Sequence, residues 1–89
     1  MFLGKVVGTV WATRKDENLV GMTLQIVTHV DFDYKEKDQF VVAVDTVQAG
    51  VGDIVLVASG SSARQTAKTK NKPVDAVIMA VVDKIDVSK

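Results

Sequence analysis

The 89-residue sequence contains no cysteine, a single histidine and no excess of charge of either sign. Without cysteine, the chain can form neither disulfides nor thiolate metal sites. The 11 basic and 11 acidic residues cancel, whereas binding to a nucleic-acid backbone needs a concentrated excess of lysine and arginine. Residues 1–11 lack the long apolar core of a signal peptide, and no apolar stretch approaches the roughly 18 residues of a membrane-spanning helix. We therefore expect a cytoplasmic protein with no nucleic-acid or membrane partner.

The residues that are abundant favour strands. Valine, isoleucine and threonine dominate, and they suit a pleated, half-buried surface. Their pattern predicts strands over residues 2–13, 22–29, 40–46, 54–58 and 75–85, with a long polar loop at 31–39. In the first run the even-numbered residues are assigned to the inside, where Gly4 and Gly8 suit a tightly curved barrel. The chain length fits one domain over residues 1–89.

Several of these strands are apolar on both faces. Leu24, Ile26, Phe40, Val42 and Val44 are assigned to the core. A second apolar set is then expected to point away from it: Val41, Ala43, Val55, Val57, Val77, Met79 and Val81. A barrel this small cannot enclose both sets, and exposed apolar surface of that extent is typical of an interface. This pattern predicts one subunit of an oligomer.

The segment SGSSAR at 59–64 is a candidate for a serine nucleophile or a phosphate-binding loop. No serine in it has both glycines of the nucleophile elbow G-x-S-x-G, and the phosphate loop G-x-x-x-x-G-K-[ST] is absent. Ser62 precedes Gln65 by the spacing of a capping box, which predicts a short helix over 63–68. Backbone N–H groups at Gly60 to Ser62 could bind an anion with help from Arg64, but a capped corner is the simpler interpretation.

Other candidate sites fail on composition. Asp45 and Thr46 are followed by valine, whereas the aspartic-protease loop requires glycine there. Asp45 is instead expected to accept hydrogen bonds from the following turn or to pair with Arg64. His29 by itself makes no metal site, and Trp11 is expected to pack in the core or against a neighbour. We therefore predict no catalytic residue, no metal and no cofactor.

Four segments together resemble the EutN/CcmL family, the pentameric vertex proteins of bacterial microcompartment shells. They are GKVVGTVWATRK at 4–15, LVGMTLQIV at 19–27, VAVDTVQAGVGDIVLVASGSSARQ at 42–65 and PVDAVIMAVVD at 73–83. The sequence departs from the family at Gln48, where glycine is frequent, and at Asp53, where glutamate is frequent. Both departures fall around the turn at 49–52.

The resemblance implies a mainly all-β fold: a small five-stranded barrel related to the oligonucleotide-binding (OB) fold, with one short helix, assembled as a ring. It also implies a pentamer that closes the corners of a shell in the bacterial cytoplasm, beside hexameric shell proteins, and catalyses no reaction. The alternative is a stand-alone barrel that binds a small ligand or nucleic acid.

The resemblance also suggests which residues lie near the ring axis or a neighbouring subunit. These are Gly50, Gly52, Gly60, Ser61, Ser62, Ala63 and Arg64. Asp45 and Asp75 are candidate partners for Arg64, within one chain or between chains.

Overall fold

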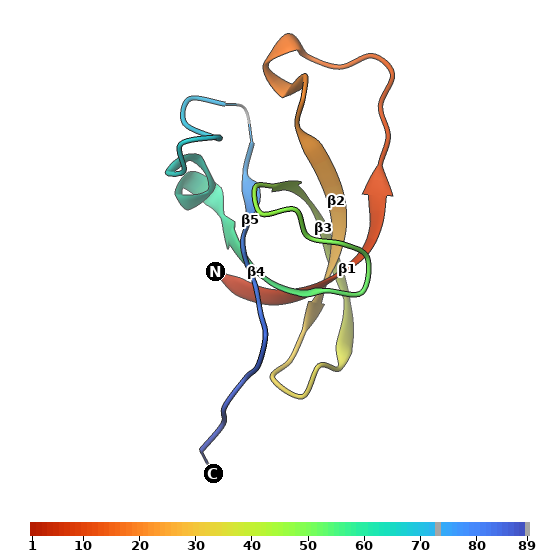
Figure 1. The fold of residues 1–89 in the computed structure, drawn as a ribbon, viewed down its shortest axis with the longest axis vertical. Coiled ribbons are helices and arrows are strands. Elements are labelled where there is room, and N and C mark those ends of the chain that lie inside the picture. Colours follow the sequence, from red (N-terminus) through yellow and green to blue (C-terminus); the bar gives the residue numbers. More distant parts are fainter. Residues whose placement is uncertain (73, 89) are drawn as a thin grey trace.

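The structure, a computed structural model, describes residues 1–72 and 74–88, which form a closed barrel of five strands (Figure 1). The strands are β1 (Phe2–Val10), β2 (Thr23–Val30), β3 (Glu36–Asp45), β4 (Ile54–Ser59) and β5 (Ala76–Val81). Their order around the barrel is β1-β2-β3-β5-β4, and β3 and β5 are parallel whereas the other neighbours are antiparallel. Short 3-10 helices, η1 (Glu17–Leu19) and η2 (Gly60–Arg64), lie in two of the connections. The predicted all-β barrel is confirmed.

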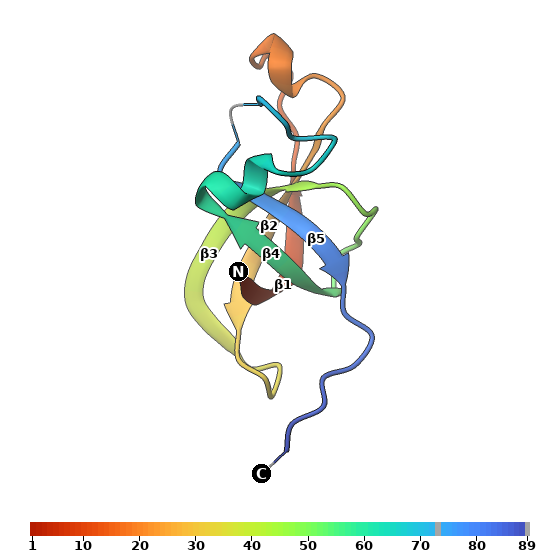
Figure 2. The ribbon, with the colours of Figure 1, turned by 90° about the vertical axis from the view of Figure 1, so that its left-hand side faces the viewer.

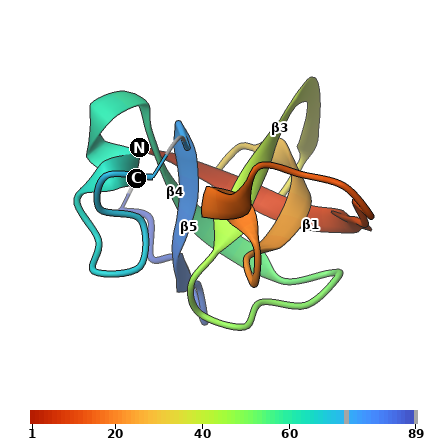
Figure 3. The same ribbon diagram turned by 90° about the horizontal axis from the view of Figure 1, so that it is seen from above.

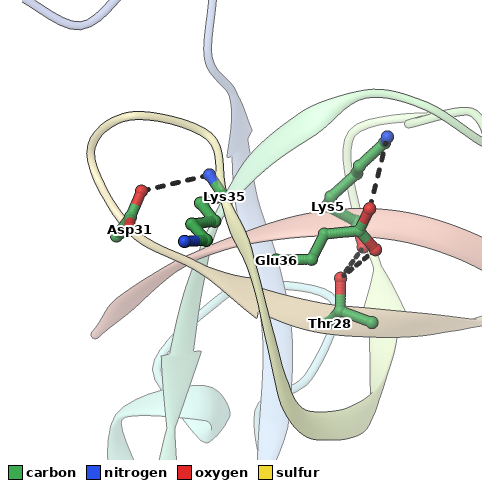
Figure 4. A network of polar contacts seen from close by, with 5 residues as sticks. All are labelled: Lys5, Thr28, Asp31, Lys35 and Glu36. Atoms are coloured by element: carbon green, nitrogen blue, oxygen red, sulfur yellow. Dashed lines mark hydrogen bonds and ion pairs between the residues drawn. The ribbon is translucent and has the colours of Figure 1, made fainter.

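The connection between β2 and β3 is a tight turn rather than the long loop expected at 31–39. Oδ1 of Asp31 accepts a hydrogen bond from the backbone N–H of Lys35 at 3.0 Å (Figure 4). It accepts another from the backbone N–H of Asp33 at 2.8 Å. These bonds, with that from Lys35 contributing most, hold the pKa of Asp31 below its usual value. Because the turn closes so early, the polar residues 36–39 belong to β3, and the hairpin extends beyond the barrel (Figure 1).

The extended part of this hairpin carries polar contacts on its exposed side. The hydroxyl of Thr28 donates to Oε1 of Glu36 at 3.3 Å, and Nζ of Lys5 lies 3.7 Å from Oε2 of the same carboxylate (Figure 4). Solvent-exposed ion pairs contribute little to stability. These contacts therefore align β1, β2 and β3 without being a main source of the folding free energy.

The last strand is shorter than predicted. β5 ends at Val81, and residues 82–88 leave the barrel without regular secondary structure, on the side toward which the β2–β3 hairpin also extends (Figures 1 and 2). None of the helices among the described residues is long and apolar enough to cross a membrane.

Every strand contributes small or β-branched residues to the barrel interior. This inner core consists of Val6, Val27, Ala43, Ala49, Val55, Val57, Ala76 and Ile78, with Phe2 and Val41 packed against it. The inward face predicted for β1 is confirmed up to Val6, because Gly4 and Val6 are buried whereas Val7 is exposed. It is wrong beyond the register shift between Val6 and Gly8, where Thr9 lies opposite buried Gln25.

The faces predicted for β2 and β3 are wrong by one residue. Gln25 and Val27 of β2 are buried, and Ala43 of β3 is fully buried, whereas Phe40 and Val42 are 64% and 44% exposed. A shift of one residue in a strand moves every side chain to the opposite face. Both faces of β3 are apolar, so alternation in the sequence could not distinguish them, and in β2 the buried face carries the polar residue Gln25.

Most of the second apolar set is nevertheless covered within the chain, because Val41, Ala43, Val55 and Val57 belong to the inner core or pack against it. Val77 belongs to a second cluster outside the barrel, which we call the outer cluster. It consists of Val44, Ala58, Ala63, Val74 and Val77, with Leu19, Met22 and Leu24 against it. Its members come from β3, β4 and β5 and from the two connections that carry η1 and η2. In the second set, Met79 and Val81 remain 39% and 38% exposed. The exposed large apolar residues are therefore largely different from those predicted, and they include Trp11, Val20, Phe40 and Val51.

At Gly4 the strands β1 and β2 lie too close together to leave room for a side chain. A Cβ atom on Gly4 would overlap Cγ1 of Val27 and lie 2.9 Å from the carbonyl oxygen of Thr28. A Cβ atom on Gly8 would instead make ordinary contact, with Cδ1 of Ile26 at 3.6 Å. The close approach that the sequence suggested is thus required at Gly4 but not at Gly8.

We predict that Gly4→Ala lowers the free energy of unfolding by about 1–3 kcal/mol, because the added methyl group overpacks a rigid strand pair. Gly8→Ala is the matched control and should change it by less than about 1 kcal/mol. Chemical denaturation at one protein concentration compares the two. A Gly4→Ala variant as stable as the Gly8→Ala variant would contradict the packing argument.

Candidate functional site

The segment SGSSAR forms the corner between β4 and η2. Gly60 has a φ of +63°, in the left-handed region that favours glycine, so the chain turns directly after the strand. Its backbone N–H donates to the carbonyl oxygen of Asp75 at 2.8 Å, which ties the corner to the segment entering β5. The N–H of Gly60 is therefore already used and cannot contribute to the anion site suggested for this helix start.

The capping box predicted for Ser62 and Gln65 is wrong. The helix spans Gly60–Arg64, so Ser62 lies inside it, and the N-cap residue Ser59 makes no capping hydrogen bond with its side chain. Ser62 instead contributes its carbonyl oxygen, which accepts from the N–H of Gln65 at 3.2 Å. The turn at Gly60 starts the helix three residues before the predicted position.

The last two residues of the corner have opposite environments. Ala63 is fully buried in the outer cluster, where a larger side chain would meet the outer face of the barrel. Arg64 is exposed, and its Nη1 donates to the carbonyl oxygen of Val74 at 3.1 Å. Among the described residues Arg64 forms no ion pair with Asp45 or Asp75, since the pairs found there are Lys5–Glu36 and Lys84–Asp86.

Asp45 is held inside its own chain. Its Oδ1 accepts from the N–H of Val47 at 2.9 Å, which confirms the predicted bond from the following turn. Its Oδ2 accepts from Nε2 of Gln25 at 3.3 Å. The same amide nitrogen donates to the carbonyl oxygen of Ala49 at 3.0 Å, and Oε1 of Gln25 accepts from the hydroxyl of Thr9 at 2.7 Å.

Gln25 is the residue that the sequence interpretation missed. It is 4% exposed, and all of its polar atoms are bonded, as buried polar groups require. Alternation placed it on the outside with its polar neighbours. Its partners come from β1, β3 and the β3–β4 connection, so no signal in the local sequence reveals the network.

Gly50 and Gly52 lie at the other end of β4 from the corner. The N–H of Gly52, whose φ is +96°, donates to the carbonyl oxygen of Val6 at 2.8 Å, and the N–H of Val6 donates to that of Asp53 at 3.0 Å. The carboxylate of Asp53 also accepts from the N–H of Gly50 at 2.8 Å. Gln48 has a φ of +60°, which accounts for a frequent glycine at this position in the family that the sequence resembles.

The structure thus separates the predicted site residues into three groups. Gly60, Ser61, Ser62, Ala63, Arg64 and Asp75 lie together at the corner, Gly50 and Gly52 form the β3–β4 turn, and Asp45 belongs to the Gln25 network. A groove of about 430 Å³ runs beside the corner, with walls that include Val41, Val42, Ser59, Gly60, Asp75 and Ala76.

The acidic residues and the single histidine are the candidates for metal binding. No group of three or more histidine, aspartate or glutamate side chains is placed to hold a metal ion within residues 1–72 and 74–88. The ring of His29 stacks face to face on Phe2, with centroids 3.9 Å apart. Large apolar side chains are instead exposed, above all Trp11 at 89%, so the core position considered for Trp11 is wrong.

The structure is thus a small closed β-barrel with several large apolar side chains exposed on its surface. Residues 1–83 match the family described as "Ethanolamine utilisation protein EutN/carboxysome". The chain belongs to the EutN/CcmL family.

Individual relatives cover almost the whole chain. A bacterial microcompartment shell vertex protein, GrpN of Rhodospirillum rubrum, is 42% identical over 86 residues, which are 97% of each chain. The carboxysome shell vertex protein CcmL of Synechocystis is 39% identical over 99% of this chain and 88% of its own length. The solved structure of the pentameric shell protein GrpN superposes with a TM-score of 0.90 at 41% identity, covering 99% of this chain and all of that one.

We predict that Asp45→Asn destabilises the barrel by about 1–3 kcal/mol. The two carboxylate oxygens accept from two different donors, and asparagine has only one oxygen, so one N–H donor would face an amide NH₂ group. Asp38→Asn makes the same change at an exposed position of β3 and should have little effect. Equal denaturation midpoints for the two variants would contradict this role of Asp45.

Proposed function

We propose that this chain is a structural subunit of a bacterial microcompartment shell, in the bacterial cytoplasm, and that it forms pentamers at the shell vertices. The observation that carries the proposal is the match, over nearly the whole chain, to vertex proteins and to a pentameric shell protein of the same fold. In this proposal residues 1–89 act as one shell domain that catalyses no reaction and holds no cofactor.

The task of such a pentamer is geometric. Flat hexagonal tiles cannot close into a polyhedron, and five-sided units supply the missing curvature at the corners. The proposed partners are therefore hexameric shell proteins around the pentamer edge. In a closed ring each subunit presents two different patches to its two neighbours. Exposed apolar side chains in different parts of the chain, such as Trp11, Phe40 and Val51, could be buried in such patches on assembly.

The corner and its surroundings are the proposed subunit contact near the ring axis. Arg64 uses one N–H group within its own chain and has others free to bond a carboxylate of a neighbour. Of the two candidate partners, Asp75 suits this role better than Asp45. Asp75 is exposed beside the corner, whereas both oxygens of Asp45 accept bonds within the chain.

The first test is native mass spectrometry of the purified, untagged protein. Five chains of 9.6 kDa give a species of about 48 kDa, which we expect to persist on dilution. A hexamer would contradict the vertex role while leaving the family unchanged. A stable 9.6 kDa monomer would contradict assembly and favour the stand-alone ligand-binding barrel.

We predict that Arg64→Ala raises the concentration at which the ring dissociates by at least about tenfold, because truncation leaves a partly buried carboxylate unpaired. Asp75→Asn should act in the same direction. Because both substitutions remove the same contact, the double-variant ring should dissociate at no higher concentration than the ring of the more damaging single variant. Arg14→Ala, in the exposed β1–β2 connection, is the matched control.

Dilution series followed by native mass spectrometry measure all four variants. An Arg64→Ala ring that dissociates at the wild-type concentration would contradict the contact. Additive effects of the two substitutions would show that Arg64 and Asp75 act separately.

A further inference from the structure

Positive charge is concentrated in one segment of an otherwise neutral chain. Residues 64–72, RQTAKTKNK, contain four cationic side chains and no acidic one, although the chain as a whole has 11 residues of each sign. None of the four takes part in the ion pairs found among the described residues. This connection between η2 and β5 therefore carries uncompensated positive charge.

The segment forms one wall of an open depression of about 920 Å³. The opposite wall is the β1–β2 connection, which carries η1 and lies at the same end of the barrel (Figures 2 and 3). The lining includes Asn18, Arg64, Gln65, Lys70, Asn71 and Lys72. Its volume falls within the roughly 300–1,000 Å³ of small-molecule sites, and its lining is polar.

Hydrogen bonds of buried Thr69 and of the surrounding backbone hold the segment that carries Lys70 and Lys72. Thr69 is fully buried, its hydroxyl donates to the carbonyl oxygen of Ala63 at 2.6 Å, and its N–H donates to the hydroxyl oxygen of Thr66 at 3.1 Å. The N–H of Lys70 donates to the carbonyl oxygen of Thr66, and that of Lys72 to that of Thr69, both at 2.9 Å. These bonds fix the positions of both lysines on the wall before any ligand binds.

The other charged residues of the depression favour an anion as well. Arg64 is oriented by its bond to Val74 and keeps N–H groups for a second, paired interaction. Asp16 is the acidic residue in the lining, and its Oδ1 accepts from the N–H of Asn18 at 2.8 Å, so this oxygen is already used in the η1 turn. Three cations against one carboxylate leave the lining net positive.

We propose that this depression binds a small phosphate-type anion, with Arg64 bonding two of its oxygens and Lys70 and Lys72 neutralising its remaining charge. A planar guanidinium fork beside mobile ammonium groups suits a multiply charged, tetrahedral oxyanion. The lining residues belong to one chain, and the site involves side chains rather than the start of η2. Arg64 also carries the proposed subunit contact, so its N–H groups not bonded to Val74 would serve both the anion and the neighbour's carboxylate. The site would add ligand binding to a protein whose proposed role is structural.

The test is calorimetric titration of the assembled protein with inorganic pyrophosphate at low ionic strength. We expect saturable binding of one pyrophosphate per chain, and at least tenfold weaker binding by the double variant Lys70→Gln/Lys72→Gln. The control Lys35→Gln/Lys84→Gln removes the same charge from exposed positions outside the depression and should bind as the wild type does. Arg64 stays intact in both variants, so its proposed subunit contact is untouched.

Two results would overturn the proposal. The wild type could show no saturable binding, or the control variant could lose as much affinity as the test variant, which would indicate attraction by overall charge alone. If the wild type does not bind and the Lys70→Gln/Lys72→Gln ring dissociates, the lysines are instead assigned to carboxylates of a neighbouring copy. Native mass spectra of the same samples separate loss of the site from loss of the ring.

Discussion

Closure of a five-stranded sheet onto itself is the constraint on which the rest of this structure depends. A barrel this narrow has room for only one layer of small side chains, and its inner core accordingly consists of valine and alanine with one isoleucine. At Gly4 even a methyl group would overlap the neighbouring strand. Strands that are apolar on both faces must therefore bury their second face outside the barrel. The connections carrying η1 and η2 cover that outer face, because Leu19 and Ala63 pack on it.

Covering the outer face also determines where the functional surfaces lie. Both connections pack against the same apolar cluster outside the barrel, so they lie at one end of the barrel with an open depression between them. Buried Thr69 fixes the second connection from below, and the lysines around it then point to the surface from a rigid backbone. The corner at Gly60 likewise depends on its bond to Asp75, which links β4 to the segment entering β5. The fold thus positions both the depression and the corner.

The polar network around buried Gln25 connects segments of a single chain. Asp45 accepts from the turn that follows it and from Gln25, and Gln25 also bonds to β1 and to the β3–β4 connection. Buried polar groups that are fully bonded favour a single register of the strands around them. This network accounts for Asp45 within one chain, and it leaves exposed Asp75 as the carboxylate beside the corner that is available to a neighbouring subunit.

The sequence by itself determined the fold class, the positions of most strands, the close approach at Gly4 and the family. These depend on composition, on periodicity and on long ordered segments such as residues 42–65, all of which are local or linear properties. It could not determine which face of β2 and β3 lies inside, because both faces of β3 are apolar and the inner face of β2 carries the polar residue Gln25. It also placed the helix too late, because the conformation of Gly60 and its bond to Asp75 decide where η2 begins. Only the tertiary structure brought residues 16–18 beside residues 61–72, because distant segments meet where a shared apolar cluster holds them.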